Sequence, residues 1–172
     1  MLPEPATSRT GRRTLRHSGY PDPVLTIGQA VRDAIIDHAR RDHPIEACGI
    51  IAGPIGSDRA ERFIPMINAE SSSTFYSLDS AEKLKVFREM DDRDEEPVVI
   101  YHSHTSTEAR PSRTDVAIAA FETAHYVLVS TRDTDGLGEF QFRSFRIVDG
   151  VVTEEEIRVL PDEAAATGEA AG

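Results

Sequence analysis

The sequence predicts a single α/β domain in which helices pack on a central sheet. Short β-branched runs that are typical of buried strands alternate with longer segments whose apolar residues recur at helical spacing. A chain of 172 residues is long enough to bury a sizeable core in one domain. No segment repeats at a period of about 20 to 50 residues, and no apolar run has the length of a membrane span.

The first part of the chain predicts one helix followed by three strands. Thr26 and Gln29 have the spacing of a capping box, which opens a helix that runs to about Asp42. The apolar stripe of this helix consists of Ala30, Val31, Ala34, Ile35, Ile36 and Ala39. Apolar and β-branched runs then predict three strands, at residues 47–53, 61–67 and 74–78.

A second helix and a buried strand come next. Asp79 and Glu82 again have the spacing of a capping box. Three residues of the helix that they open are expected to face the sheet, namely Leu84, Phe87 and Met90. Residues 97–101 are introduced by proline and are mostly β-branched, so they predict a buried strand that ends at His102.

The last part of the chain predicts one more helix and three strands. Ser112 and Asp115 precede the apolar run 116–121, a pattern typical of a capping box at the start of a helix. Residues 125–131 predict a strand, and the turn at residues 148–151 joins the final two strands as a hairpin.

Two histidines at the end of the strand before this helix are candidate metal ligands. His102 and His104 are two positions apart, so their side chains share a face of a strand, and the strand-loop-helix turn returns Asp115 to the same end of the sheet. Two imidazoles and a carboxylate can bind one Zn²⁺ and leave its fourth position open for water. A plain helix cap is the alternative interpretation of Ser112 and Asp115, and the two interpretations are compatible.

A hydrolytic metal site also needs a general base, for which Glu46 is the candidate. It lies 56 residues before His102, where a proline ends the first helix and an apolar strand begins. An acidic side chain at the start of a core strand costs desolvation energy unless it has a partner. A solvated glutamate in a loop is the alternative that this segment by itself leaves open.

Together these residues resemble the complete motif of the JAMM (MPN-plus) metalloproteases. The motif consists of Glu46 in Pro-x-Glu-Ala-Cys-Gly, then His102-x-His104, seven residues and Ser112-x-x-Asp115. The resemblance extends over about residues 26–160. It implies the three-layer MPN/JAMM fold, which is like that of cytidine deaminases, with a central mixed sheet flanked by helices. A deaminase is itself excluded, since it needs a Pro-Cys-x-x-Cys and the chain has one cysteine.

The resemblance implies a role for each residue of the motif. His102, His104 and Asp115 would ligate Zn²⁺, although the same ligand types also bind Fe²⁺ or Mn²⁺. Glu46 would take a proton from the bound water and return it to the leaving amine. Ser112 would donate a hydrogen bond to the oxyanion.

Details around the motif narrow the resemblance to one branch of the family. Thr105 stands where many members have proline, and with residues 75–79 and 124–131 it makes the chain similar to the actinobacterial branch called Mec. Members of that branch hydrolyse the amide bond between the carboxyl-terminal Gly-Gly of a ubiquitin-like sulfur-carrier protein of the CysO type and an attached L-cysteine, in cysteine biosynthesis. Two alternatives stay open. The chain could process another ubiquitin-like carrier tail, as in siderophore or thiamine sulfur pathways, or it could be a non-catalytic MPN scaffold, although such scaffolds typically lack the histidines or the aspartate.

The segment at residues 73–79 is predicted to contact the substrate. An extended carboxyl-terminal tail can add as a strand to an exposed sheet edge, and we expect Phe75 and Tyr76 to flank it, with Thr105 nearby. Inward packing of at least one of the two rings is the alternative.

Charge and cysteine content restrict partners and location. The formal net charge is −11, and most of it falls within residues 25–160, the predicted catalytic domain. A nucleic-acid partner is therefore not expected, because phosphate binding needs a basic face. A single cysteine, Cys48, excludes an internal disulfide and suits a reducing cytoplasm. The oligomeric state stays open, a homodimer included.

Both ends are predicted to lie outside the domain. Residues 1–24 carry four arginines against two acidic residues and predict a flexible basic leader, or a start codon assigned too early. A targeting peptide or nucleic-acid tail is the alternative, but no apolar h-region accompanies the arginines. Residues 161–172 are mainly alanine, glycine and acidic residues and predict a disordered acidic tail.

Overall fold

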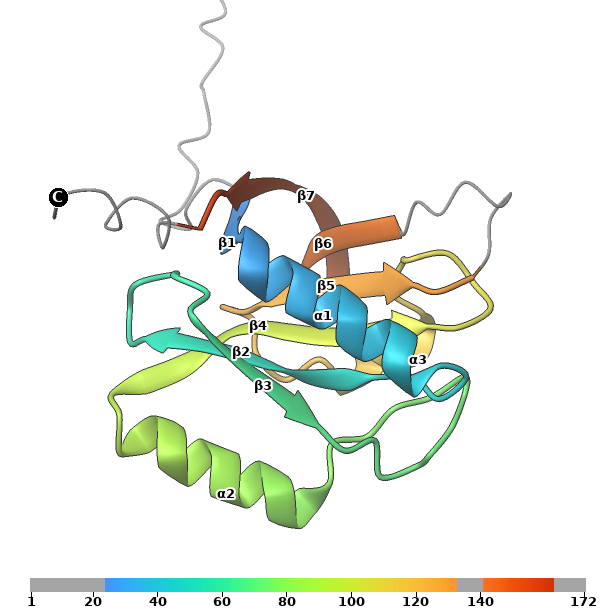
Figure 1. Ribbon diagram of the computed structural model, residues 1–172, viewed down its shortest axis with the longest axis horizontal. Helices are drawn as coiled ribbons and strands as arrows, with labels where there is room; N and C mark the ends of the chain where they lie inside the picture. Colours follow the sequence, from blue (N-terminus) through green and yellow to red (C-terminus); the bar gives the residue numbers. More distant parts are fainter. Residues whose placement is uncertain (1–23, 133–140, 163–172) are drawn as a thin grey trace, which may run out of the picture.

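The computed structural model describes residues 24–132 and 141–162 (Figure 1). Most of the expected basic leader and acidic tail lies outside the described residues, so those two predictions stay untested. Within the described ranges, three helices are interspersed among seven strands, as in an α/β fold. The helices are α1 Gln29–Asp42, α2 Ser80–Asp91 and α3 Arg113–Ile118.

The strands of the described ranges form one mixed, seven-stranded sheet in the order β1-β7-β6-β5-β4-β2-β3. β1 runs parallel to β7, and β4 runs parallel to β5, whereas the other neighbours are antiparallel. The strands are β1 Val24–Gly28, β2 Cys48–Pro54, β3 Arg62–Met66, β4 Glu95–His104, β5 His125–Ser130, β6 Gln141–Val148 and β7 Val151–Leu160.

Helices cover both faces of the sheet and so make three layers. Successive residues of β4 pack into different cores, because side chains alternate along a strand. Val99 and Tyr101 pack in the core that contains Ile35 of α1, and Ile100 packs in the core that contains Met90 of α2. Figure 1 shows α1 lying across the strands. The predicted architecture, a central mixed sheet flanked by helices, is confirmed.

α1 ends at the predicted residue but begins differently from the prediction. Its N-cap is Gly28, which has no side chain to cap it, and Thr26 lies inside β1. Thr26 pairs with Arg158 of β7, while Leu25 and Ile27 on either side are fully buried. The predicted capping box is therefore wrong, because strand pairing and burial over residues 24–28 outweigh a local capping signal.

Residues 74–78 do not form the predicted strand. Within this segment only an isolated bridge joins Leu78 to Asn68. Instead, the carbonyl of Phe75 accepts a hydrogen bond from the side chain of Asn68, and the N–H of Ser77 donates one to it. The side chain of Asn68 thus satisfies backbone groups that would otherwise bond to a neighbouring strand.

The predicted cap of α2 is present, but part of its predicted inner face is not. The carboxylate of Asp79 accepts hydrogen bonds from the backbone N–H groups of Ala81 and Glu82. Met90 is buried and Phe87 packs against the core, as predicted. Leu84, however, is 53% exposed, and Val86 takes the buried position, because residue 86 shares the face of residue 90 one helical turn later.

The segments after α2 follow the prediction, with small differences in length. β4 extends to His104, so both histidines belong to the strand, and α3 stops at Ile118. Asp149 and Gly150 join the last two strands with φ angles of 50° and 74°, the left-handed values that two-residue hairpin turns need. In the described part of the chain, no helix is both long and apolar enough to cross a membrane.

A buried polar network centred on Glu155 connects β5, β6 and β7. Oε1 of Glu155 lies 2.5 Å from Nδ1 of His125 and accepts a hydrogen bond from the Ser144 hydroxyl at 2.6 Å. Nε of Arg146 donates to Oε2 at 3.3 Å. Burial opposes the charge of Glu155, but these contacts outweigh it and lower the pKa of the carboxyl group.

We expect Glu155→Gln to lower the free energy of unfolding by about 3 kcal/mol at neutral pH, because it leaves buried partners without their anion. A carboxyl group whose pKa is lower in the folded state stabilises the fold above its unfolded pKa and loses that effect as the pH falls. The difference between wild type and variant should therefore shrink as the pH falls from about 5 to about 3.

Urea unfolding at several pH values measures this difference. Glu156→Gln removes a charge from an exposed neighbour on the same strand and serves as the control. A difference between wild type and Glu155→Gln that is equal at every pH would contradict the role of the ionised carboxylate.

Candidate metal centre

The three candidate ligands meet at the carboxyl end of β4. His102 and His104 point to the same face of the sheet, and the loop after β4 brings Asp115, in the first turn of α3, over that end. All three side chains are buried. The sequence prediction that Asp115 returns to the histidines thus agrees with the structure.

The distances within this triad suit a metal ion. The two Nε2 atoms of His102 and His104 are 3.2 Å apart. Oδ1 of Asp115 lies 3.3 Å from Nε2 of His102, and Oδ2 lies 3.4 Å from Nε2 of His104. Ligands of a tetrahedral ion with bonds of about 2.0–2.1 Å are separated by roughly 3.3–3.4 Å. The three side chains therefore fit one metal ion and would leave a fourth position for another ligand.

The two histidines are held in different ways. Nδ1 of His104 lies 2.9 Å from the carbonyl oxygen of Glu108 and 3.1 Å from the hydroxyl of Thr107, so it can donate and leave Nε2 free for a metal. Nδ1 of His102 is buried and, among the described residues, has no hydrogen-bond partner. The ring of Tyr76 instead stacks on His102, with 4.3 Å between ring centroids and an interplanar angle of 22°.

Asp115 also belongs to a helix cap, as the alternative interpretation expects. The backbone N–H of Ser112 donates to Oδ2 of Asp115 at 2.6 Å, and the N–H of Asp115 donates to the Ser112 hydroxyl at 3.2 Å. The capping box thereby fixes the carboxylate relative to the histidines. The hydroxyl of Ser112 accepts in this bond, so its own proton stays available to a further acceptor.

Strand pairing brings Glu46 to the same place. β2 is antiparallel to β4, and Cys48 pairs with His102. Immediately beyond, the N–H of Ala47 donates to the Ser103 hydroxyl at 2.8 Å, and the N–H of Ser103 donates to the Ala47 carbonyl at 2.9 Å. Continuing this register by one residue places Glu46 beside His104, on the face that carries both histidines.

The two carboxylates of the site have different electrostatic surroundings. Burial raises the pKa of Glu46 to about 7, and the nearby charge of Asp115 adds to this effect while that of His104 opposes it. Burial also acts against ionisation of Asp115, but the adjacent imidazoles of His102 and His104 hold the pKa of its carboxyl well below the usual range. Asp115 is therefore an anion near neutral pH, and Glu46 can both accept and release a proton there.

Two of the three predicted substrate contacts, Tyr76 and Thr105, lie next to the triad. Phe75 is half-buried, and it lines a cavity of about 250 Å³ with Tyr76, Leu78, Ile118 and Phe121 among others. Tyr76 is only 5% exposed, so the alternative of an inward-packed ring holds for this residue. The hydroxyl of Thr105 donates to the carbonyl of Ser73 at 2.8 Å and so ties the loop after β4 to the segment that carries both rings.

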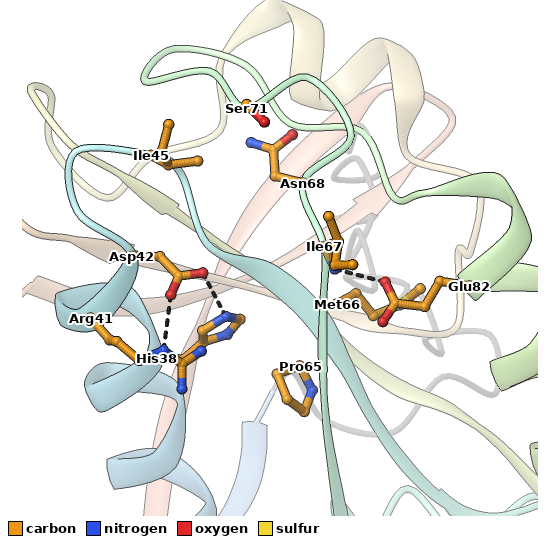
Figure 2. A pocket seen from close by; sticks show the side chains of 10 residues that line it. All are labelled: His38, Arg41, Asp42, Ile45, Pro65, Met66, Ile67, Asn68, Ser71 and Glu82. Carbon is orange, nitrogen blue, oxygen red and sulfur yellow. Dashed lines mark hydrogen bonds and ion pairs between the residues drawn. The ribbon is translucent and has the colours of Figure 1, made fainter.

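Sequence reasoning did not identify Asn68. It follows β3 and is buried, and its side-chain amide bonds to the backbone of Glu46. Figure 2 shows it beside Ser71 in the wall of a cavity of about 390 Å³. A single asparagine after a strand reads as an ordinary turn residue, so no local pattern points to this contact.

Known proteins share this chain's domain. The family model described as "Prokaryotic homologs of the JAB domain" matches residues 28–148, which contain Glu46 and the whole triad. The CysO-cysteine peptidase of Mycobacterium tuberculosis (strain ATCC 25618 / H37Rv) is 64% identical over 137 residues, which cover 80% of this chain and 92% of that protein. A desampylase from Haloferax volcanii is 30% identical over 111 residues, which cover 62% of this chain and 80% of that protein.

Solved structures agree with this relationship. The solution structure of protein DSY2949 from Desulfitobacterium hafniense has a TM-score of 0.69 and 29% identity, and the match covers 81% of this chain and 94% of that one. The resemblance expected from the sequence motif is confirmed. The chain belongs to the family of prokaryotic homologs of the JAB domain, which is the JAMM family that its motif resembles.

Proposed function

We propose that the chain is a zinc-dependent hydrolase that cleaves the amide bond between the carboxyl-terminal Gly-Gly of a ubiquitin-like sulfur-carrier protein and an attached L-cysteine. One observation carries the chemistry, namely a buried Glu46 next to a His-His-Asp triad with 3.2–3.4 Å between ligand atoms. The substrate follows from the 64% identity to a protein named CysO-cysteine peptidase. The single, buried Cys48 suits a cytoplasmic location.

Zinc suits the donor set of the triad. Two imidazole nitrogens and one carboxylate are the ligand types of catalytic zinc sites with an open position, although Fe²⁺ and Mn²⁺ accept the same donors. Bound zinc lowers the pKa of a water ligand to about 7 and polarises a carbonyl group. Nδ1 of His104 is already held by Glu108 and Thr107, which directs Nε2 to the centre of the triad.

Glu46 acts as the general base and then as the general acid. The attacking water gives its proton to the carboxylate as its oxygen bonds to the carbonyl carbon of the terminal glycine. When the carbon–nitrogen bond breaks, Glu46 returns that proton to the nitrogen of cysteine, which leaves as an amine. A pKa raised by burial to about 7 suits both steps near neutral pH.

Ser112 donates a hydrogen bond to the oxygen of the attacked carbonyl as negative charge develops on it. Its hydroxyl oxygen is occupied by the N–H of Asp115, but its proton is available. The capping box holds the hydroxyl in place before the substrate arrives, which is the condition for electrostatic stabilisation of a transition state.

The carrier tail approaches along residues 73–79. We propose that it lies extended beside this segment and that Phe75 contacts it at the mouth of the cavity of about 250 Å³. Thr105 holds the segment through its bond to Ser73.

A second candidate function is the cleavage of another ubiquitin-like tail, which the 30% identity to a desampylase favours.

Glu46→Gln should lower kcat by at least about 10²-fold, because the amide cannot carry the proton. The assay follows, by mass spectrometry, the loss of one cysteine from a carrier–cysteine adduct. Glu156→Gln, an exposed glutamate of β7, should keep wild-type activity. An adduct left intact by the wild type, together with cleavage of another carrier tail, would favour the second candidate, and full activity of Glu46→Gln would refute the hydrolytic mechanism.

Removal of metal with a chelator should abolish activity, and added zinc should restore it, because the triad then regains its cation. His104→Ala and Asp115→Asn should lose bound zinc, whereas His43→Ala, which changes an exposed histidine outside the triad, should retain it. Elemental analysis of the purified variants measures the metal content. Zinc bound equally by all of these variants would place the metal elsewhere.

Ser112→Ala should lower kcat by about 10²-fold through loss of the hydrogen-bond donor. It should also lower the free energy of unfolding by about 1 kcal/mol through loss of the helix cap. Ser112→Gly separates the two effects, since glycine at an N-cap costs only a few tenths of a kcal/mol but also lacks the hydroxyl. Steady-state kinetics and urea unfolding of both variants measure them, and a kcat that changes only with stability would argue against the catalytic role.

A further inference from the structure

The loop at residues 68–78 contacts both the candidate base and a candidate ligand, and its first residue, Asn68, bonds to Glu46 and to the backbone on both sides of Tyr76. Asn68 is 7% exposed and lies two residues after the end of β3. Figure 2 shows its amide at the side of the cavity where the turn with Ser71 lies. A buried primary amide needs hydrogen-bond partners for its two N–H donors and for its acceptor oxygen. The partners of Asn68 therefore identify the groups that this side chain holds in place.

Asn68 uses its whole amide to bind backbone groups. Nδ2 donates to the carbonyl of Glu46 and to the carbonyl of Phe75, both at 3.1 Å. Oδ1 accepts from the N–H of Glu70 at 3.1 Å and from the N–H of Ser77 at 3.2 Å. One side chain therefore fastens both ends of the loop and joins them to the residue proposed as the base.

Both backbone groups of Glu46 are bound by this loop. Its N–H donates to the carbonyl of Ser72 at 2.9 Å, and its carbonyl accepts from Asn68. Glu46 lies just before the start of β2, so these bonds replace the strand ladder that orients the following residues. The direction of the Glu46 side chain thus depends on the loop.

The same loop carries the ring that packs on a proposed metal ligand. Tyr76 stacks on His102 with 4.3 Å between centroids, and Nδ1 of His102 has no partner among the described residues. Metal-binding histidines are usually oriented by a hydrogen bond from the other ring nitrogen, as His104 is by the Glu108 carbonyl. For His102, the stacked ring of Tyr76 is a contact that can orient the imidazole without such a bond.

We propose that Asn68 is a positioning residue for both parts of the site, holding Glu46 through its carbonyl and His102 through Tyr76. The proposal rests on the zinc and base roles given above. A purely structural role would lower stability alone. A positioning role changes zinc affinity and turnover in protein that is still folded.

Asn68→Asp tests the amide at constant shape. It keeps an acceptor for Glu70 and Ser77 but sets an oxygen against the carbonyls of Glu46 and Phe75. We expect zinc affinity, measured by competition with a chelator, to weaken by about 10-fold or more. We expect kcat at saturating zinc to fall by a similar factor, while circular dichroism shows a folded protein. Ser71→Ala, an exposed residue of the same loop, is the control and should match wild type in both measurements.

Two variants test the stacked ring. Tyr76→Phe keeps the ring and should bind zinc with wild-type affinity, whereas Tyr76→Leu removes it and should bind about 10-fold more weakly. The visible spectrum of Co²⁺-substituted protein, which reports ligand geometry, should be unchanged in Tyr76→Phe and altered in Tyr76→Leu and Asn68→Asp.

Wild-type zinc affinity, kcat and Co²⁺ spectrum in a folded Asn68→Asp would overturn the proposal. If Asn68→Asp does not fold, the Tyr76 variants decide, and equal affinity and spectra in Tyr76→Phe and Tyr76→Leu would overturn it. These measurements of affinity and spectrum need no substrate. Absence of zinc binding in the wild type would instead refute the proposed function.

Discussion

The antiparallel pairing of β2 with β4 is the constraint on which the rest of the site depends. It sets Cys48 opposite His102, and the two bonds between Ala47 and Ser103 extend the pairing to residues 56 positions apart in the chain. A shift of one residue would turn the histidines to the other face. The cores on both sides of β4 oppose such a shift, because Tyr101 and Ile100 are each buried against a different helix layer.

This pairing and the capped start of α3 together gather four titratable side chains in a buried place, which is unfavourable unless their charges are balanced. Asp115 gains compensation from two imidazoles and from the N–H of Ser112. Glu46 has less compensation for its charge, so burial raises the pKa of its carboxyl group to about 7. The same protein environment thus keeps one carboxylate ionised, as a metal ligand must be, and leaves the other able to exchange protons.

The irregular loop at residues 68–78 contributes what a regular strand could not. Asn68, Tyr76 and the carbonyl of Ser73 each contact a different part of the site, because the loop is free of the two-residue alternation of a strand. If residues 68–78 formed a further strand of the sheet, every second side chain would face away from the histidines. Loops that carry functional residues on a rigid sheet are common in enzymes, and here the side chain of Asn68 supplies the rigidity.

The sequence by itself determined the family, the α/β class, the candidate ligands and the cap of α3, because these follow from motifs and from local periodicity. The spacing of His102, His104 and Asp115 is enough to predict a strand, a loop and a helix that close on each other. The tertiary structure decided the features that depend on distant partners. Thr26 belongs to a strand since β7 lies beside it, Leu84 is exposed since Val86 and Met90 face the sheet, and Asn68 reaches Glu46 across 22 residues. Such contacts depend on which segments meet in space, and a local sequence window carries no information about that.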